Sequence, residues 1–371
     1  MSLSKLKQSF LKDDKIIHIH CSSYGEYLMS EALTINLKKE FFDYKFLLSF
    51  ISPSGYENAN KNLFDCVIYL PFETNKNLKN FYNTIAPKIT IFIKNEIWPN
   101  YISHAKLNGS KVYSIGGNFR YNFLKKIINF NSAIKKLDAI FVSNEKSQKL
   151  IKNIGNKNVF ICGDLRFDSI IPSLNNKENK IISEFINNKK CIVFGSTWEE
   201  DEKLIIKYIN KSEKDYKYII APHEIAKNCN RIKQKIEKKS ILFSELKLNQ
   251  NKNDFSCLII DNIGMLSSLY SFCTIAYVGG GMGEKGLHNT LEPAYFSKPI
   301  VIGKNYDKFD EAKDMIKNEG MISISNYNEL DNSLERILNN NDEINRMSKN
   351  NSDYFNKHKG AVKLILKQIS K

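Results

Sequence analysis

The residue types best suited to chemistry gather in one glycine-rich stretch, YVGGGMGEKGLHNTLEPA at residues 277–294. Apolar residues typical of a strand lead into a glycine cluster that contains Gly280 and Gly281, and the residues after it predict a helix. Glycines at a strand end let backbone N–H groups approach a phosphate, and a helix N-terminus adds its dipole. Glu292, one helical turn further on, could accept hydrogen bonds from ribose hydroxyls. A plain glycine turn is the simpler interpretation, but the combination favours nucleotide recognition.

A second candidate is the lone carboxylate of Glu26 in CSSYGEY, which follows the apolar run KIIHIH at residues 15–20. A Gly-Glu pair at a strand-to-helix junction places this carboxylate near a helix N-terminus, where backbone N–H groups and the dipole favour negative charge. Local sequence alone favours a helix-entry acid over a catalytic group.

Further polar groups follow predicted strands: Glu96, Arg166, Ser196, Pro222 with His223, and Asp261. Any one of them is more often a capping or packing residue, but their recurrence at strand ends favours a functional set. The chain contains neither G-x-x-x-x-G-K-[ST] nor G-x-S-x-G, and its histidines show no metal-binding spacing. Carboxylates, a phosphate-type loop, Arg and Lys together suit group transfer from an activated nucleotide, by general base and electrostatic stabilisation.

The elements that must position these residues alternate along the chain, which predicts an α/β fold with parallel sheets covered on both faces. The predicted strands are 16–21, 45–51, 66–70, 89–93, 111–115, 139–142, 159–162, 191–195, 217–221, 257–260, 275–278 and 299–302. The predicted helices are 26–40, 57–64, 76–84, 144–153, 199–212, 224–238, 263–272 and 308–318.

A polar stretch, IPSLNNKENK at residues 171–180, separates two series of strands and predicts a linker. Ligands of open α/β sheets bind outside the carboxyl ends of the strands, so functional residues should face one another across a cleft between two Rossmann-like, doubly wound domains. The predicted boundaries are 1–172 for the first domain, 173–180 for the linker, 181–345 for the second domain and 346–371 for a closing C-terminal helix.

The formal net charge of +15 is unevenly distributed. Residues 1–172 carry ten more basic than acidic side chains, and residues 173–371 carry five more. Such a surface suits phosphates, nucleic acid or anionic lipid, although a solvated face is the better interpretation for any one lysine. Between residues 97 and 137 there is no acid and there are seven basic residues, Lys106, Lys111, Arg120, Lys125, Lys126, Lys135 and Lys136.

The cysteine pattern and the N-terminus bear on the compartment. Seven scattered cysteines without a C-x-x-C pair predict a reduced, cytosolic-side protein. No apolar run approaches the roughly 20 residues that span a bilayer, and the N-terminus lacks the apolar core of a signal peptide. Leu3, Leu6, Phe10 and Leu11 share one face of a short basic helix, which could lie on a membrane surface or, by default, pack on its own domain.

Eight motifs together resemble the 3-deoxy-D-manno-oct-2-ulosonic acid (Kdo) transferase family of lipopolysaccharide and lipid A assembly. They occur in the family's order between about residues 16 and 315, and eight in order are highly specific. The motifs are SSYGEY, SPSGYE (52–57), KNEIWPN (94–100), GDLRFD (163–168), GSTWEEDE (195–202), APHE (221–224), DNIGMLSSLY (261–270) and GGG…HNTLEPA.

The resemblance implies a GT-B glycosyltransferase whose C-terminal domain binds CMP-Kdo and whose N-terminal domain binds a lipid A precursor. It implies metal-independent, inverting transfer to a glucosamine hydroxyl with release of CMP and no cofactor. By resemblance, Glu26 is the general base, and Glu96 and Arg166 are transition-state stabilisers. The donor positions that match are Pro222, His223, Ile263, Gly264, Met265, Asn289, Thr290, Leu291 and Glu292, to which the strand-end pattern adds Ser196, Gly280 and Gly281.

Two departures and two alternatives accompany this assignment. Many family members begin with a hydrophobic anchor that this sequence lacks, so we expect peripheral attachment to an anionic surface at the cytoplasmic face of the inner membrane. Many also carry Pro-Arg-His where this chain has Ala221-Pro222-His223, so His223 or a nearby lysine would have to replace the arginine. The alternatives are a GT-B enzyme for another nucleotide sugar and a non-catalytic basic protein that binds lipid or nucleic acid. The nucleic-acid alternative lacks aromatic-basic motifs of the RNA-recognition kind.

Overall fold

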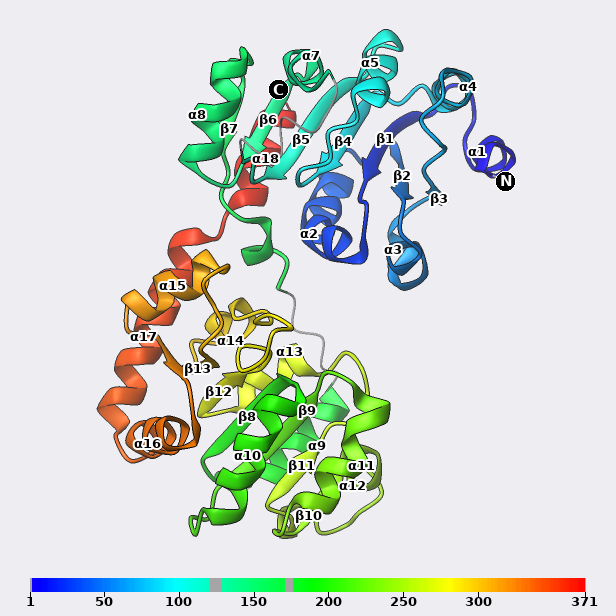
Figure 1. Ribbon diagram of the computed structural model, residues 1–371. Helices are drawn as coiled ribbons and strands as arrows, with labels where there is room; N and C mark the ends of the chain where they lie inside the picture. The colour runs from blue at the N-terminus through cyan, green and yellow to red at the C-terminus, as the bar shows by residue number, and fades with distance from the viewer. Residues whose placement is uncertain (1, 121–128, 171–175, 371) are drawn as a thin grey trace. The chain divides into compact units, whose positions relative to one another are not determined.

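The computed structural model describes residues 2–120, 129–170 and 176–370, and divides into two compact units (Figure 1). The first unit comprises Met1–Ser169 together with His358–Lys371, and the second comprises Ile170–Lys357.

The first unit is built on a seven-stranded parallel sheet in the order β3-β2-β1-β4-β5-β6-β7. Its strands are β1 (Lys15–His20), β2 (Tyr44–Phe50), β3 (Cys66–Tyr69), β4 (Ile89–Ile93), β5 (Lys111–Gly117), β6 (Ala139–Val142) and β7 (Val159–Ile161). Its helices are α1 (Ser2–Ser9), α2 (Tyr24–Glu40), α3 (Pro53–Asn58), η1 (Lys61–Leu63), α4 (Asn75–Ile85), α5 (Pro99–Leu107), α7 (Phe130–Lys136), α8 (Glu145–Ile154), η2 (Leu165–Phe167) and α18 (Ala361–Ile369).

Both faces of this first sheet are buried, as the near-continuous apolar strands require. One face packs against α1, α4, α5, α7 and α8, and the other against α2, α3 and α18. Leu6 and Phe10 of the N-terminal segment are buried in the first of these cores. The N-terminal amphipathic helix therefore packs on its own domain, which was the default expectation. Leu6 and Phe10 are not available to a membrane.

The second unit repeats the architecture with the strand order β10-β11-β9-β8-β12-β13-β14. Its strands are β8 (Cys191–Thr197), β9 (Lys217–Pro222), β10 (Ser240–Leu242), β11 (Cys257–Ile259), β12 (Ile275–Val278), β13 (Ile300–Gly303) and β14 (Met321–Ile324). Its helices are α9 (Asn176–Ile186), α10 (Glu199–Lys211), α11 (Ile225–Lys235), α12 (Phe243–Leu246), η3 (Lys252–Asp254), α13 (Leu266–Leu269), η4 (Tyr270–Phe272), α14 (Leu291–Tyr295), α15 (Asp310–Lys317), α16 (Tyr327–Leu338) and α17 (Asn341–His358).

The α/β fold class is confirmed, and every predicted strand is present to within about two residues, but several elements differ. The short edge strands β10 and β14 and the helices α5 and α16 were not predicted. The helix predicted at 57–64 is instead α3 followed by η1, because Ser52 caps a helix that begins with Pro53. Within the predicted linker, 171–175 lie outside the described residues and the rest is the start of α9.

The predicted closing helix at 346–371 is two helices that belong to different units. α17 lies in the second unit except for its last residue, His358, and α18 packs its apolar stripe, which includes Val362 and Ile365, into the core of the first. The carboxylate of Asp168 accepts the backbone N–H groups of Gly360 (2.9 Å) and Val362 (3.1 Å), and so caps the start of α18.

Candidate active site

Glu26 lies in the first turn of α2, directly after the interior strand β1 and the short loop that follows it. Its Oε2 atom accepts the backbone N–H of Ser23 at 2.9 Å, so this carboxylate does cap the helix. The side chain is only partly exposed. The helix-entry role favoured by local sequence is therefore real, and it holds the carboxylate at the carboxyl end of the sheet.

The loop after β4 brings a second carboxylate close to the first. The pKa of Glu26 is raised by burial and by the negative charge of Glu96, and is lowered less by the Ser23 N–H and the positive charge of Lys94. Glu96 is itself oriented, because Trp98 Nε1 donates a hydrogen bond to its Oε2 at 2.7 Å. The structure thus brings Glu26 and Glu96 together and adds Lys94 and Trp98, which were overlooked although both lie in the KNEIWPN motif.

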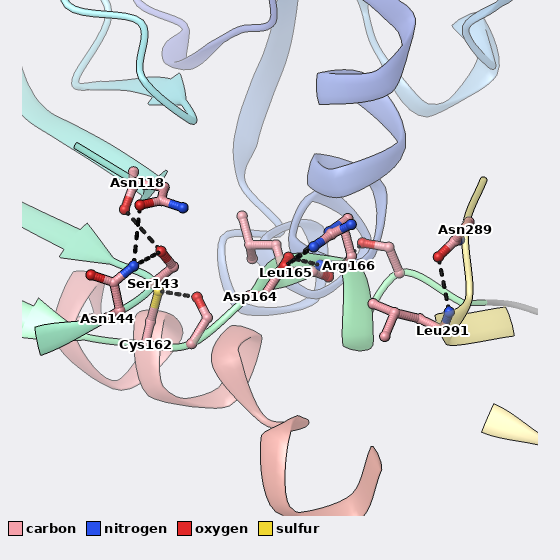
Figure 2. A network of polar contacts seen from close by, with 12 residues as sticks. Asn118, Ser143, Asn144, Cys162, Asp164, Leu165, Arg166, Asn289 and Leu291 are labelled. Atoms are coloured by element: carbon pink, nitrogen blue, oxygen red, sulfur yellow. Dashed lines mark hydrogen bonds and ion pairs between the residues drawn. The ribbon is translucent and has the colours of Figure 1, made fainter. Parts of the chain in front are cut away.

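Arg166 lies in η2, a short helix that packs against α2. Its Nε and Nη2 atoms donate to Oδ2 of Asp164 at 2.8 and 2.6 Å, and the other oxygen of Asp164 accepts its backbone N–H (Figure 2). The segment is anchored to the helix that carries Glu26, since Ser169 Oγ donates to the carbonyl of Met29 at 3.1 Å. Asp164 was missed, although the GDLRFD motif contains it, and it fixes the direction of the guanidinium.

In the second unit, a cavity of about 710 Å³ opens at the carboxyl ends of β8, β9 and β11. Such a volume suits a small-molecule ligand. Its lining includes five of the predicted donor residues, namely Ser196, Pro222, His223, Ile263 and Gly264. Met265 is buried and is not among the lining residues.

Two features of this cavity indicate a ligand site rather than a surface depression. Ser196 has a left-handed backbone, with φ of +52°, at a bulge where the pairing of β8 with β9 shifts register. Asn262 lines the cavity, and its buried Oδ1 has no hydrogen-bond partner within the described residues, so it is available to a ligand.

In the glycine cluster, one N–H group that was predicted to face a phosphate is already hydrogen-bonded within the protein. The N–H of Gly280 donates to the buried carboxylate of Asp201 at 2.8 Å, and so is not available to a phosphate. A Cβ atom at Gly279 would lie 2.4 Å from the carbonyl oxygen of Ser196, and one at Gly281 would lie 3.0 Å from the backbone of Gly303. These glycines are required because backbone segments pack closely there, and a phosphate contact from Gly281 stays a prediction.

The segment after the glycines keeps polar groups but has a weaker dipole than expected, because α14 is a helix of only five residues. Asn289 Oδ1 accepts the N–H of Leu291 at 3.1 Å, and Asn289 Nδ2 donates to Glu292 at 3.1 Å. Burial raises the pKa of Glu292 to about 7, and the bond from Asn289 opposes that rise. Thr290 is buried, and none of these four residues lines the 710 Å³ cavity.

A cluster of aromatic rings joins three strand ends of the second unit. Trp198, at the start of α10, stacks on His223 with ring centroids 4.5 Å apart, and His223 lies 4.6 Å from His288. Trp198 Nε1 donates to His288 Nε2 at 2.8 Å, and the ammonium of Lys285 lies 5.2 Å from the Trp198 ring centre. Only His223 of this set was predicted, because nothing in the linear sequence links residues 198 and 288.

The basic stretch between residues 97 and 137 is only partly free surface. Lys106 is ion-paired with Asp138 at 2.7 Å, whereas Lys111, Arg120, Lys135 and Lys136 are exposed. Lys125 and Lys126 lie outside the described residues.

Across 2–120, 129–170 and 176–370 no group of three or more His, Cys, Asp or Glu side chains is placed to hold a metal ion. None of the helices in these ranges is both long and apolar enough to cross a membrane.

Comparison with solved structures first defines the class of fold. A glycosyltransferase from Rickettsia africae aligns with 97% of this chain and 98% of its own, at a TM-score of 0.61 and 14% identity. A UDP-GlcNAc 2-epimerase from Neisseria meningitidis, bound to UDP-GlcNAc, aligns with 96% of this chain and 99% of its own at a TM-score of 0.67 and 14% identity. The two parallel seven-stranded sheets therefore belong to the GT-B class.

Sequence comparison then indicates the family. Residues 3–169 match the family model of 3-deoxy-D-manno-octulosonic-acid transferase (kdotransferase). The transferase of that name from Rickettsia bellii is 28% identical, over 96% of this chain and 88% of its own. A bifunctional glycosyltransferase/methyltransferase from Fusobacterium nucleatum is 29% identical over 90% of this chain, which spans only 55% of that relative. The chain is thus similar to Kdo transferases over most of its length, and its residues 3–169 match their family model.

Proposed function

We propose that this chain transfers Kdo from CMP-Kdo to a glucosamine hydroxyl of a lipid A precursor with inversion, and that Glu26 is the general base. The single observation that carries the proposal is the pairing of Glu26 with Glu96 at the carboxyl end of the first sheet, in a chain similar to this family. A carboxylate whose pKa is raised by burial and by a neighbouring anion is a stronger proton acceptor than an ordinary one.

The chemistry requires a base because a sugar hydroxyl is too weak an acid to attack as an alkoxide. The acceptor oxygen forms a bond to the anomeric carbon of Kdo while the bond from that carbon to the CMP phosphate oxygen breaks. The hydroxyl proton moves to Glu26, and the electron pair of the broken bond leaves with CMP. Proton acceptance by a positioned carboxylate contributes about 10²- to 10⁴-fold to such a step.

The other two predicted catalytic groups act on charge. Arg166, directed by Asp164, would stabilise the negative charge that develops on the leaving phosphate. Glu96 would stabilise positive charge that develops on the sugar, and it keeps the pKa of Glu26 raised. Lys94 opposes that effect and so keeps Glu26 ionised and able to accept a proton.

The second unit would bind the donor. The cavity beside Ser196, Pro222, His223, Ile263 and Gly264 has the size and the mixed lining of a nucleotide site. The N–H of Gly280 is bound to Asp201, whereas Gly281 stays a predicted donor contact. Asn289 and Glu292 would contact the donor from a neighbouring segment.

The acceptor would be held at a membrane surface by the first unit. A lipid A precursor is an acidic glycolipid, and Lys111, Arg120, Lys135 and Lys136 present exposed positive charge in that unit. We place the protein peripherally at the cytoplasmic face of the bacterial inner membrane.

The test is to incubate the protein with CMP-Kdo and a lipid A precursor and to measure release of CMP. We expect CMP release that depends on the acceptor and a product whose mass increases by one Kdo residue or more. UDP-sugars are tested in parallel, because the aligned epimerase binds UDP-GlcNAc. Turnover of a UDP-sugar but not of CMP-Kdo would refute the donor assignment, and nucleotide release without acceptor would refute the transfer reaction.

A further inference from the structure

The Trp198–His288 hydrogen bond defines the protonation state of a histidine beside the donor cavity. Trp198 Nε1 can only donate, and it lies 2.8 Å from His288 Nε2, so that nitrogen must be the unprotonated acceptor. A neutral His288 then carries its hydrogen on Nδ1. Within the described residues Nδ1 makes no hydrogen bond and is not enclosed, so its hydrogen is available to a ligand.

The rings around this bond are arranged to hold it. The planes of Trp198 and His288 are inclined by 12°, and their centroids lie 6.3 Å apart, as two rings joined edge to edge would be. His223 stacks on Trp198 with ring centroids 4.5 Å apart, and its ring lies 4.6 Å from that of His288 at a tilt of 30°. His288 is tied to the sheet through its own backbone N–H, which donates to the carbonyl of Gly279 at 3.1 Å.

The backbone of Trp198 is fixed as firmly as its ring. Its N–H donates to Oδ2 of the buried Asp201 at 2.9 Å, and the same carboxylate accepts the Tyr277 hydroxyl and the N–H of Gly280. One buried carboxylate therefore ties the end of β8 to β12 and to the loop that carries His288. The indole is thus held in place before any ligand binds.

We infer that Trp198 is a positioning residue for the nucleotide donor, because it holds His288 as the neutral Nδ1–H tautomer that donates to an anionic oxygen of that donor. The inference rests on the proposed function for the identity of the donor. The location of the site does not depend on which donor binds. The ring of His288 lies against His223, a residue of the cavity lining, and His288 directly precedes Asn289.

Protonation of His288 is disfavoured in this arrangement. Burial and the neighbouring His223 lower the pKa of His288 to about 4, and a second proton would have to occupy the nitrogen that faces the indole N–H. The ionisable side chains on this loop, directly after His223 and in the first turn of α10 are Glu284, Lys285, Glu224, Glu199, Glu200, Asp201 and Glu202. The hydrogen bond from His288 should therefore be present at every pH between about 5.5 and 8.

The test compares CMP binding by the wild-type protein and by Trp198→Phe, using calorimetry at pH 8. Phe keeps a ring for His223 to stack on but has no N–H, so nothing holds the hydrogen of His288 on Nδ1. We expect the variant to bind CMP about 3- to 10-fold more weakly, the worth of one hydrogen bond.

Rescue by a fixed donor separates this positioning role from a merely structural one. The double variant Trp198→Phe/His288→Asn has an amide N–H in place of Nδ1–H and no tautomer to select, so it should recover most of the wild-type affinity. A wild-type affinity in Trp198→Phe, or an equal loss in the double variant, would overturn the inference.

A second pair of variants covers the case in which Trp198→Phe does not fold. His288→Asn should keep most of the CMP affinity at pH 8, and His288→Leu should lose about as much as Trp198→Phe is expected to lose. Equal affinities for the two His288 variants would overturn the inference. If the wild-type protein binds no CMP, the proposed donor is wrong. The two failures are distinguishable, because the comparison of variants requires a wild-type protein that binds CMP.

Discussion

Replacement of Glu26 by glutamine separates the two roles that the structure combines in this carboxylate. The glutamine side chain retains an oxygen that can accept the Ser23 N–H, so the first turn of α2 stays capped. It cannot accept a proton at neutral pH. We therefore expect Glu26→Gln to fold normally and to lose about 10²- to 10⁴-fold in the rate of transfer, or about 2.7–5.4 kcal/mol of transition-state stabilisation.

Replacement of Glu26 by alanine removes both roles, and the comparison gives the energetic share of each. The lost hydrogen bond from Ser23 should lower the free energy of unfolding by about 1 kcal/mol. In a unit of this size that corresponds to a fall of roughly 2–4 °C in melting temperature. The rate of Glu26→Ala should be no lower than that of Glu26→Gln, because both lack the base.

The assay is the initial rate of acceptor-dependent CMP release, with CMP affinity and melting temperature measured on the same preparations. Glu329→Gln is the matched control, because Glu329 also accepts a backbone N–H at the start of a helix, from Ser325 at 2.8 Å in the second unit. The control should retain the wild-type rate. A wild-type rate for Glu26→Gln, or an equal loss in Glu329→Gln, would refute the assignment of Glu26 as the base.

The pH dependence of the same reaction tests why Glu26 is a good base. Since its pKa is raised, kcat/KM should fall on the acid side at a pH above the ordinary carboxyl range. Glu96→Gln removes a negative charge and should move this acid limb to lower pH, whereas Lys94→Met removes a positive charge and should move it to higher pH. Shifts in the same direction for both variants would contradict the electrostatic explanation.

Four further variants test the supporting structure. Gly279→Ala places a Cβ atom 2.4 Å from a backbone oxygen and should lower the unfolding free energy by about 1–3 kcal/mol, measured in urea; an unchanged midpoint would contradict the close packing. Arg231→Met leaves the buried Glu202 unpaired and should cost about 3 kcal/mol at neutral pH. Burial already raises the pKa of Glu202, so this loss should shrink as pH falls and the carboxylate is protonated; a loss independent of pH would argue against it. Lys135→Glu should weaken binding to anionic vesicles without lowering the melting temperature. Lys106→Glu should weaken vesicle binding and also lower the melting temperature, because it breaks the ion pair of Lys106 with Asp138.

Periodicity was enough to predict the sheets because a parallel strand buried on both faces is apolar throughout, and such runs are visible in a single sequence. It did not predict β10 and β14, which are edge strands of three and four residues. It also treated the C-terminus as one closing helix, because helical spacing does not state which core a helix packs against. The return of α18 to the first unit depends on contacts such as that of Asp168 with Gly360.

By itself, the sequence determined that Glu26 enters a helix after the first strand, because a Gly-Glu pair at such a junction is a local signal. It also indicated the family that the chain resembles, because motifs keep their order along the chain. Only the tertiary structure decided what each motif does. It placed Glu96 and Lys94 beside Glu26, turned the N–H of Gly280 toward Asp201, and joined Trp198 to His288 across 90 residues. The physical reason is that hydrogen bonds and charges act between atoms a few ångströms apart, and the folding of two sheets decides which distant residues reach that range.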